Sequence, residues 1–340
     1  MLSEGATNEN LKELSDLLNL TPDHNLRFPA LQSLHEKLNT EVDGIGYDKD
    51  FKEEKQIYLK TSVANSAWIS NDFQVIERYR TVLKEYYSAE LETVNMRDPG
   101  VPTRVNNWIK DKTNGLIDKV INDIPSSTVM ILVNTIYFKA KWAMPFESSR
   151  TSKRMFTKRD HSQVERDFMA HRGYFINHIP VGDDTYVFEL GYKGYKHCMI
   201  FKYGKNGLQH IKEDEINKLI HENNRTNTRA DLYIPKFDIE TSYDMKEMLE
   251  RLDVHNIFKL STTGFSGISK DTGLGVSGII HKSKIKVNED GTEAAAVTAI
   301  FLAGSAYIPT KPKLVVLDHP FSYYVYHIKE RLVLFSGVLG

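Results

Sequence analysis

The stretch that decides the fold begins at residue 287 and reads Val287-Asn288-Glu289-Asp290-Gly291-Thr292-Glu293-Ala294-Ala295-Ala296. It continues to Pro312 and lies between two segments with strand patterns, Gly278–Val287 and Leu314–Leu317. A connection of this length is much longer than a hairpin needs, and long connections inside compact domains are usually functional. Residues 289–312 are therefore the first candidate for a functional loop.

The two halves of this loop differ in composition. Gly291–Ala299 is almost entirely small, whereas Ile300–Pro309 is apolar and uncharged. The run Glu293–Ala296 has high helix propensity. The β-branched residues that follow it and the lack of an amphipathic stripe disfavour a helix. Composition alone leaves a helix and an extended loop equally open.

The chain as a whole has the composition of an ordinary globular protein. Its 340 residues are 41% hydrophobic and 26% charged, which is enough apolar material for a sizeable core. The formal net charge of -1 argues against a general nucleic-acid binder. The single cysteine, Cys198, excludes an internal disulfide and a cysteine-based zinc site. No apolar run approaches the roughly 18–20 residues of a membrane span, and Met1–Asn10 lacks the sections of a signal peptide.

The order of the expected elements indicates an α+β fold in a single domain, because no repeat or low-complexity tract divides residues 1–340. Apolar spacing predicts mainly helices in the first sixty residues, then a strand over Ile57–Val63 and helices over Asp72–Tyr87 and Val105–Ile121. Strand patterns dominate afterwards. The expected strands are Val129–Phe138, Ala230–Ile239, Gly278–Val287, Leu314–Leu317, Phe321–His327 and Leu332–Val338, with short helices over Glu213–Glu222 and Ser242–Leu252.

The motifs that could indicate an enzyme lack the neighbouring residues that the corresponding chemistry requires. Gly273–Gly278 has the glycine spacing of a dinucleotide-binding loop, but the residues after it alternate like a strand, and that chemistry needs a helix N-terminus. The histidines have no metalloprotease spacing, so we interpret them as surface or core residues. Lys282, Lys284 and Lys286 could grip an anionic polymer, and a solvated strand face is the favoured interpretation. The sequence therefore favours a protein that is not an enzyme and predicts no cofactor and no metal.

Further motifs occur in the order found in one family. They are Asn106-Asn107-Trp108-Ile109, Leu132–Trp142, Ile234-Pro235-Lys236-Phe237, Phe265-Ser266-Gly267-Ile268, Asp318-His319-Pro320-Phe321 and Leu334-Phe335-Ser336-Gly337. Together with Val287–Ala296, which resembles the hinge of a reactive loop, they cover nearly the whole chain. The sequence is identified as a member of the serpin (serine protease inhibitor) superfamily. The resemblance implies a large central mixed β-sheet with additional sheets, helices clustered around it, and an exposed reactive-centre loop at residues 289–312.

The resemblance implies a suicide mechanism of protease inhibition. A serine or cysteine protease cleaves the loop of a serpin, and the N-terminal part of the loop inserts as a new strand into the central sheet. The captured acyl-enzyme is distorted, so deacylation stalls. Backbone hydrogen bonds on both sides of the new strand, at ~0.5–1.5 kcal/mol each, sum to the order of 10 kcal/mol. The native fold is then metastable, and a target protease is the expected partner.

Residue parity in the hinge agrees with an inhibitory role. The expected hinge residues are Glu289, Gly291, Thr292, Glu293, Ala294, Ala295, Ala296, Val297 and Thr298. Side chains of a strand alternate between its faces, so the even-numbered residues from Thr292 to Thr298 would face the core. All four are small and uncharged. Glu293 falls on the other parity and would stay in water, whereas an inward charge would oppose insertion.

The usual family register places the reactive bond between Ser305 and Ala306. A small residue there fits an elastase-like pocket, while Leu302 or Tyr307 would attract a chymotrypsin- or cathepsin-like protease. Basic residues begin only at Lys311, so trypsin-like proteases are expected to be inhibited poorly.

Three residues correspond to the region where serpin strands part to admit the loop: Asn134, Trp142 and His281. The resemblance implies that Asn134 and His281 meet under the sheet and that Trp142 lies at the top of the opening. Two satisfied polar groups and a core aromatic residue are the plainer interpretation. Asn134 lies inside an apolar run and must find partners or cost ~1–3 kcal/mol.

The sequence departs from the family most clearly at its start. Met1–Ala6 resembles the end of the second family helix, so we expect the first helix, a short strand and most of the second helix to be absent. Their absence would leave apolar sheet surface exposed and leave Asn134 and His281 short of partners. Gly191 stands where the family favours proline, and Asp253 stands where glycine is usual.

Two other functions stay open beside protease inhibition. One is a non-inhibitory serpin that serves as a carrier, chaperone or storage protein. The other is a truncated inactive form that is prone to strand-exchange oligomers, although a monomer is expected. No nucleic-acid or membrane partner is expected. The sequons Asn19-Leu20-Thr21 and Asn224-Arg225-Thr226 favour a secreted, extracellular full-length parent, while this chain shows no signal peptide.

Overall fold

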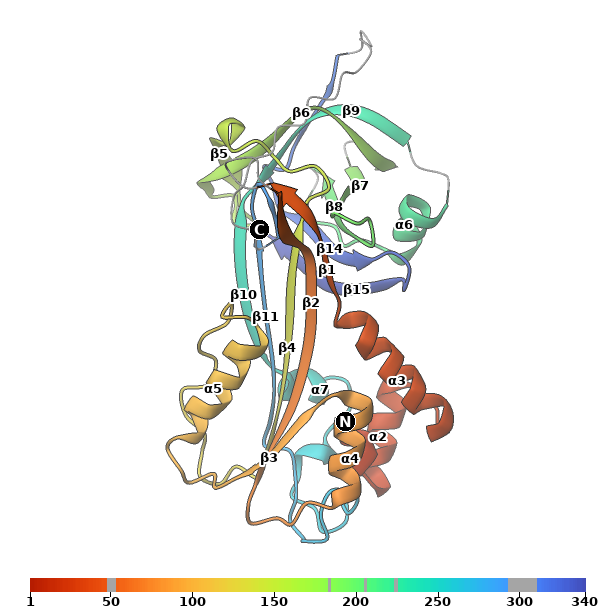
Figure 1. Ribbon diagram of the computed structural model, residues 1–340, viewed down its shortest axis with the longest axis vertical. Coiled ribbons are helices and arrows are strands. Elements are labelled where there is room, and N and C mark those ends of the chain that lie inside the picture. The colour runs from red at the N-terminus through yellow and green to blue at the C-terminus, as the bar shows by residue number, and fades with distance from the viewer. Residues whose placement is uncertain (48–52, 183–184, 205–206, 223–225, 293–310) are drawn as a thin grey trace. The chain divides into compact units, whose positions relative to one another are not determined.

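The computed structural model describes residues 1–47, 53–182, 185–204, 207–222, 226–292 and 311–340 (Figure 1). These residues form two compact units. Unit 1 comprises Met1–Thr40, Thr61–Tyr137 and Glu240–Lys284, and unit 2 comprises Glu41–Lys60, Phe138–Ile239 and Ile285–Gly340. Several strands contribute residues to both units: β2 (Glu53–Ser70), β4 (Met130–Lys141), β10 (Phe237–Asp244) and β11 (Gly278–Val287).

Unit 1 is built from helices on both sides of a group of strands. Its helices are α1 (Leu2–Gly5), α2 (Asn8–Leu18), α3 (His24–Leu38), α4 (Glu77–Tyr87), α5 (Val101–Lys112) and α7 (Met245–Glu250), with the 3-10 turn η3 (Asn256–Phe258). Figure 1 shows α5 on one side of the strands and α2, α3 and α4 on the other. Strand β3 (Glu90–Val94) pairs in parallel with β2, and β4 pairs in parallel with β11. None of the described helices has the length and apolarity to cross a membrane.

Strand β4 is buried on both faces, as its continuous apolar sequence predicts. Met130 and Leu132 pack into one core together with residues of α1, α2 and α4. Ile131 and Val133 pack into a second core together with residues of α5. Because successive side chains of a strand point to opposite faces, one apolar run supplies both cores.

The predicted helix over Val105–Ile121 is wrong beyond α5, which ends at Lys112. The Thr113 hydroxyl donates to the carbonyl of Ile109 (2.8 Å) and so satisfies a carbonyl at the end of the helix. The Asn106 Oδ1 accepts from the backbone N–H of Ile121 (2.9 Å) and holds the following segment in an irregular path. Apolar residues of that segment still pack into the same hydrophobic core as α5. Their spacing therefore resembles that of a helix although the segment is irregular.

Other predicted elements differ in extent. Helix α4 begins at Glu77, and β2 is longer than the predicted strand. The predicted helix over Glu213–Glu222 consists of α6 (Glu213–Ile216) followed by a π-helical turn, η2 (Asn217–His221). The predicted strand over Ala230–Ile239 is interrupted at Lys236, between β9 (Thr226–Pro235) and β10.

Unit 2 is dominated by an eight-stranded sheet in the order β13-β9-β6-β7-β8-β14-β15, with β5 paired to β6. Besides β9, the strands of this sheet are β5 (Ser152–Thr157), β6 (Gln163–Gly182), β7 (Thr185–Gly191), β8 (His197–Gly204), β13 (Lys313–Val316), β14 (Phe321–His327) and β15 (Leu332–Leu339). Unit 2 also contains the 3-10 turn η1 (Ser148–Arg150). Strand β1 (Glu41–Tyr47) pairs with β2. All eight residues of β8 are buried, and residues of α6 and η2 cover one face of the sheet.

The interpretation of Lys282, Lys284 and Lys286 as a solvated face is wrong for Lys282. Its side chain is 9% exposed, and its Nζ lies 2.8 Å from the Glu240 carboxylate. Lys284 contacts the other carboxylate oxygen of Glu240 at 3.2 Å. Hydrogen bonds from Lys282 and then Lys284 hold the pKa of Glu240 below its ordinary value, despite partial burial. Only Lys286 is exposed.

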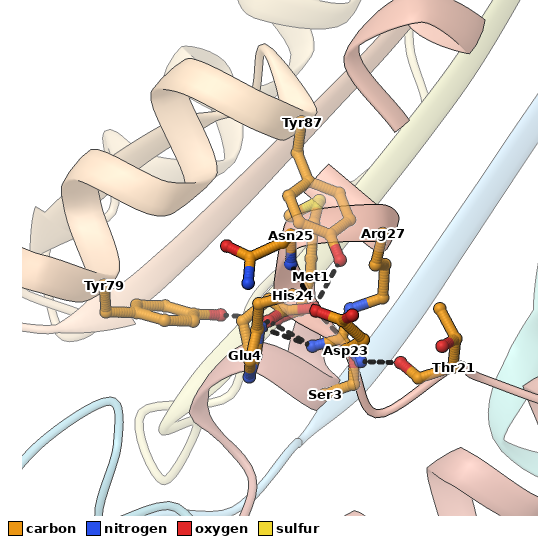
Figure 2. A network of polar contacts seen from close by, with 10 residues as sticks. All are labelled: Met1, Ser3, Glu4, Thr21, Asp23, His24, Asn25, Arg27, Tyr79 and Tyr87. Carbon is orange, nitrogen blue, oxygen red and sulfur yellow. Dashed lines mark hydrogen bonds and ion pairs between the residues drawn. The ribbon is translucent and has the colours of Figure 1, made fainter. Parts of the chain in front are cut away.

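A buried polar network ties α1 to α3 and α4 (Figure 2). The Glu4 side chain is 2% exposed and accepts from Arg27 Nη2 (2.9 Å) and from the Tyr87 hydroxyl (2.7 Å). Arg27 also donates to the carbonyl of Thr21 (2.8 Å). Burial and the neighbouring Glu4 carboxylate raise the pKa of Tyr87. The network therefore pairs the Glu4 carboxylate with the Arg27 guanidinium in the interior of unit 1.

We expect Glu4→Gln to destabilise the fold by about 3–5 kcal/mol, because it removes the counter-charge of a buried guanidinium. The urea midpoint of unfolding measures this loss. The matched control is Glu247→Gln, since Glu247 and its partner Arg251 are both 76% exposed and such pairs contribute only about 0–1 kcal/mol. A midpoint that moves no more in Glu4→Gln than in the control would contradict the prediction.

Candidate functional site

The first residues of the predicted loop already form a strand. After β11 the chain turns at Asn288, and β12 (Gly291–Thr292) returns between β11 and β4. Thr292 pairs antiparallel with Val287 of β11 and with Ala140 of β4. The described part of the predicted loop therefore ends at Thr292, between these two strands.

Gly291 is required by the closeness of β4. A Cβ atom at this position would lie 2.0 Å from the carbonyl oxygen of Ala140, far inside any possible contact. Only a residue without a side chain allows β12 to approach this closely.

Thr292 is fully buried and polar contacts hold it in place. Its Oγ1 lies 2.7 Å from the Tyr192 hydroxyl. The ring of Trp142 stacks on Tyr192, with centroids 4.6 Å apart and planes 5° apart. Trp142 Nε1 donates to the carbonyl of Asn288 (3.0 Å). The two aromatic rings thus connect both ends of the turn that starts the loop.

Glu289 is fixed by its side chain and by its backbone. Its Oε1 accepts from the Thr151 hydroxyl (2.7 Å), and Lys236 Nζ lies 2.9 Å from Oε2. Its carbonyl accepts from the backbone N–H of Phe146 (2.8 Å). Burial alone would raise the pKa of Glu289, but the bonds from Thr151 and Lys236 hold it below the ordinary value. The charged carboxylate is therefore the form that anchors the turn.

In unit 1, Asn134 and His281 are directly opposite each other on β4 and β11. His281 Nδ1 lies 2.7 Å from Asn134 Oδ1, and Asn134 Nδ2 donates to Asn65 Oδ1 of β2 (2.8 Å). Burial lowers the pKa of His281 below its ordinary value. The expectation that Asn134 and His281 lack partners is wrong, because Asn65 completes the network.

The predicted site residues thus fall into separate places. Asn134 and His281 meet, whereas Trp142 contacts the loop turn at Asn288. The following predicted residues lie outside the described residues: Glu293, Ala294, Ala295, Ala296, Val297, Thr298, Ser305 and Ala306. Their roles, and that of the hinge as a whole, stay predictions.

Sequence reasoning missed several contacts of the site. Thr151 carries no signal, because it lies in an irregular segment far from Glu289 in the sequence. Lys236 lies in a motif that the sequence singled out, but no local pattern pairs it or Tyr192 with the loop. Within the part of the chain that the structure describes, no cluster of histidine, cysteine and carboxylate side chains could hold a metal ion.

Comparison with known proteins identifies the family. The sequence profile of the family described as Serpin (serine protease inhibitor) matches residues 1–339. An uncharacterized serpin-like protein of Thermococcus kodakarensis is 30% identical over 346 residues, which cover 99% of this chain and 76% of that protein. The leukocyte elastase inhibitor of Xenopus laevis is 30% identical over 330 residues, 92% of this chain and 84% of that protein.

The fold is that of solved serpins. The crystal structure of Serpin48, a highly specific serpin of the insect Tenebrio molitor, is similar with a TM-score of 0.79 at 27% identity. The similarity covers 99% of this chain and 87% of that one. The α+β serpin fold predicted from the sequence is confirmed. The chain belongs to the serpin family.

Proposed function

We propose that this chain is a protease inhibitor that traps its target when residues 289–312 are cleaved and insert into the sheet. Residues 1–340 then act as one serpin domain. The observation that carries the proposal is the position of β12, whose two residues already lie between β4 and β11. Further loop residues would extend this strand by the same pairing.

The chemistry of the proposed trap starts at the reactive bond. The serine hydroxyl of the protease attacks the carbonyl carbon of Ser305, the peptide bond to Ala306 breaks, and the amine of Ala306 leaves. The protease is then held as an ester at Ser305. Insertion of the loop would distort the protease before water hydrolyses this ester. The protein is consumed in this reaction and does not act as a catalyst.

The proposed target is an elastase- or chymotrypsin-like serine protease. Ser305 is small, and apolar residues surround it from Ile300 to Ile308. The name of the similar leukocyte elastase inhibitor points to the same class.

Incubation with elastase, chymotrypsin and trypsin tests the proposal. We expect a denaturant-resistant adduct with elastase or chymotrypsin, cleavage between Ser305 and Ala306, and little adduct with trypsin. Gel electrophoresis and N-terminal sequencing of the released fragment provide the readouts. Cleavage with neither an adduct nor an increase in heat resistance would assign the chain to the non-inhibitory serpins.

Substitution of a hinge residue on the inward parity should separate cleavage from trapping. We expect Ala294→Arg to be cleaved at the normal rate but to form at least about tenfold less adduct, because insertion would bury an unpaired charge at a cost of several kcal/mol. The control is Ala295→Arg, which adds the same charge at the neighbouring position of opposite parity. Equal trapping by both variants would contradict the proposed strand register.

Acid should ease the separation of β4 and β11. Neutral His281 contributes stability that is fully present above about pH 6.5 and is lost as the pH falls toward its lowered folded pKa. We therefore expect the melting temperature of the wild type to fall more than that of His281→Gln between pH 7 and pH 5. The exposed His255→Gln variant is the control. Parallel curves for wild type and His281→Gln would refute this contribution.

A further inference from the structure

Unit 2 contains an open hollow of about 370 Å³ beside the start of β5. Three arginine side chains line it: Arg150 of η1, Arg154 of β5 and Arg172 of β6. The other lining residues are Ser149, Thr151, Ser152, Ala170 and Tyr233. None of these described lining residues is acidic, so the hollow brings three guanidinium groups together among hydroxyl groups.

Arg154 is fixed at the wall of the hollow by an aromatic ring. Its guanidinium carbon lies 3.7 Å from the centroid of the Tyr233 ring, which also lines the hollow. Its Nε atom is buried and has no hydrogen-bond partner among the described residues. A planar guanidinium that is already stacked loses little freedom when it binds an anion. Arg154 therefore keeps a fixed hydrogen-bonding group that the described chain does not use.

Arg154 is also directly opposite a second arginine, Arg166, in the pairing of β5 with β6. The Arg166 guanidinium lies 5.2 Å from the centroid of the Phe156 ring, and its Nε is likewise buried without a hydrogen-bond partner among the described residues. Like charges that are directly opposite destabilise an antiparallel pair. A bound anion would offset this repulsion.

A β-bulge carries Arg172 into the lining. The pairing of β6 with β9 shifts register between His171 and Tyr174. Gly173 inside this bulge has a left-handed backbone (φ 62°), and its N–H donates to Asp231 Oδ1 (2.8 Å). Bulges re-aim side chains and are frequent next to functional sites. The exposed Arg172 side chain is thus carried by a backbone conformation that the sheet holds in place.

Two of the three guanidinium groups lack a counter-charge. Arg150 has one, because Glu147 Oε2 lies 2.7 Å from its Nε. No ion pair or hydrogen bond joins the side chain of Arg154 or Arg172 to another described residue. The hollow therefore carries two positive charges that the described part of the chain does not compensate.

The nearby carboxylates have cations of their own. Glu289 accepts from the hydroxyl of the lining residue Thr151 (2.7 Å), but Lys236 Nζ lies 2.9 Å from its other oxygen. Asp167 of β6 lies 3.2 Å from Lys153 Nζ. This pair is next to the arginine pair in the register of β5 with β6, so it lies on the opposite face of the sheet. These carboxylates therefore leave the charge of the hollow in place.

We propose that this hollow binds a phosphate dianion, either free phosphate or the phosphate group of a small monoester. The fork of an arginine matches two oxygens of a phosphate group. A carboxylate has only two oxygens and is satisfied by one arginine, whereas a tetrahedral phosphate accepts from guanidinium groups and hydroxyls on several sides. Its two charges match the two arginines that have no counter-charge. The proposal does not depend on the trapping of proteases.

The surface around the hollow favours a small ligand over a long polyanion. The side chains of Glu147, Glu165 and Asp167 are between 46% and 60% exposed and flank η1, β5 and β6. A string of anionic groups that extended beyond the hollow would meet these carboxylates and be repelled. The formal net charge of -1 gives the chain no general attraction for polyanions either.

The test is isothermal titration calorimetry of the intact protein at pH 7.5 in a buffer of low ionic strength, because salt screens such charges. The probes are inorganic phosphate, methyl phosphate and methyl sulfate. Methyl sulfate has the shape of methyl phosphate but one negative charge less. We expect saturable binding of phosphate or methyl phosphate, at least about tenfold tighter than that of methyl sulfate. The tighter of the two phosphates identifies the source of the group.

Variants assign the binding to the hollow. Arg172→Gln and Arg154→Met should each weaken phosphate binding about fivefold or more, because each removes a charged fork. Arg172 is exposed, so Arg172→Gln keeps the fold if Arg154→Met does not. Arg159→Gln is the control and should bind normally, since Arg159 is an exposed arginine after β5 that does not line the hollow.

Three outcomes would overturn the proposal. They are the absence of saturable binding, equal affinity for methyl phosphate and methyl sulfate, and unchanged affinity in Arg172→Gln. None of these readouts involves a protease, so a failed adduct test would leave the result on phosphate binding intact.

Discussion

The approach of the Gly291 backbone to Ala140 is the constraint on which the rest of the site depends. It brings β12 between β4 and β11, and no residue with a side chain would fit there. Once this contact exists, Thr292 must face the interior and meet Tyr192, and the turn before it must present Asn288 to Trp142. The polar anchoring of Glu289 then follows from the path of the backbone.

The same strands are paired differently in the two units. In unit 1, β4 and β11 pair directly and in parallel, from Ile131 opposite Gly278 onward. In unit 2, β12 takes the place between them and pairs antiparallel with both. Antiparallel pairs are slightly more stable per residue than parallel pairs. Under the proposed function, insertion replaces one parallel ladder by two antiparallel ones, which gives the native sheet a reason to be metastable.

Sequence patterns predict the elements of this fold whose structure depends on neighbouring residues in the chain. The apolar run from Met130 predicted a strand buried on both faces, because alternation sends neighbouring side chains to different cores. The same reasoning failed after Lys112, because an irregular segment tied down by Asn106 buries its apolar residues as a helix would. The spacing of apolar residues indicates which side chains are buried. It does not indicate a helical backbone where hydrogen bonds from side chains replace the backbone hydrogen bonds of a helix.

Long-range polar partners were beyond the reach of the sequence. Glu289 binds Thr151 and Lys236, which are far from it in the chain, and no spacing rule connects them. Lys282 was assigned to a solvated face because alternation cannot reveal that Glu240 lies within 2.8 Å. The motifs of the family located the loop and its neighbours, but only the folded chain shows which charges meet.

The strand register links the hinge to the polar network of the sheet. Continuing the pairing of Thr292 with Ala140 along β4 brings Thr298 opposite Asn134. Continuing the pairing of Thr292 with Val287 along β11 brings the same residue opposite His281. An inserted loop would therefore separate Asn134 from His281 at the point where it carries a hydroxyl. That hydroxyl can both donate and accept, so it can replace the lost hydrogen bond and leave no buried polar group unsatisfied. An apolar residue at this position would fill the same space but leave two orphaned groups. Under the proposed function, the parity that keeps the hinge small would therefore also supply a polar atom at the point where insertion needs one.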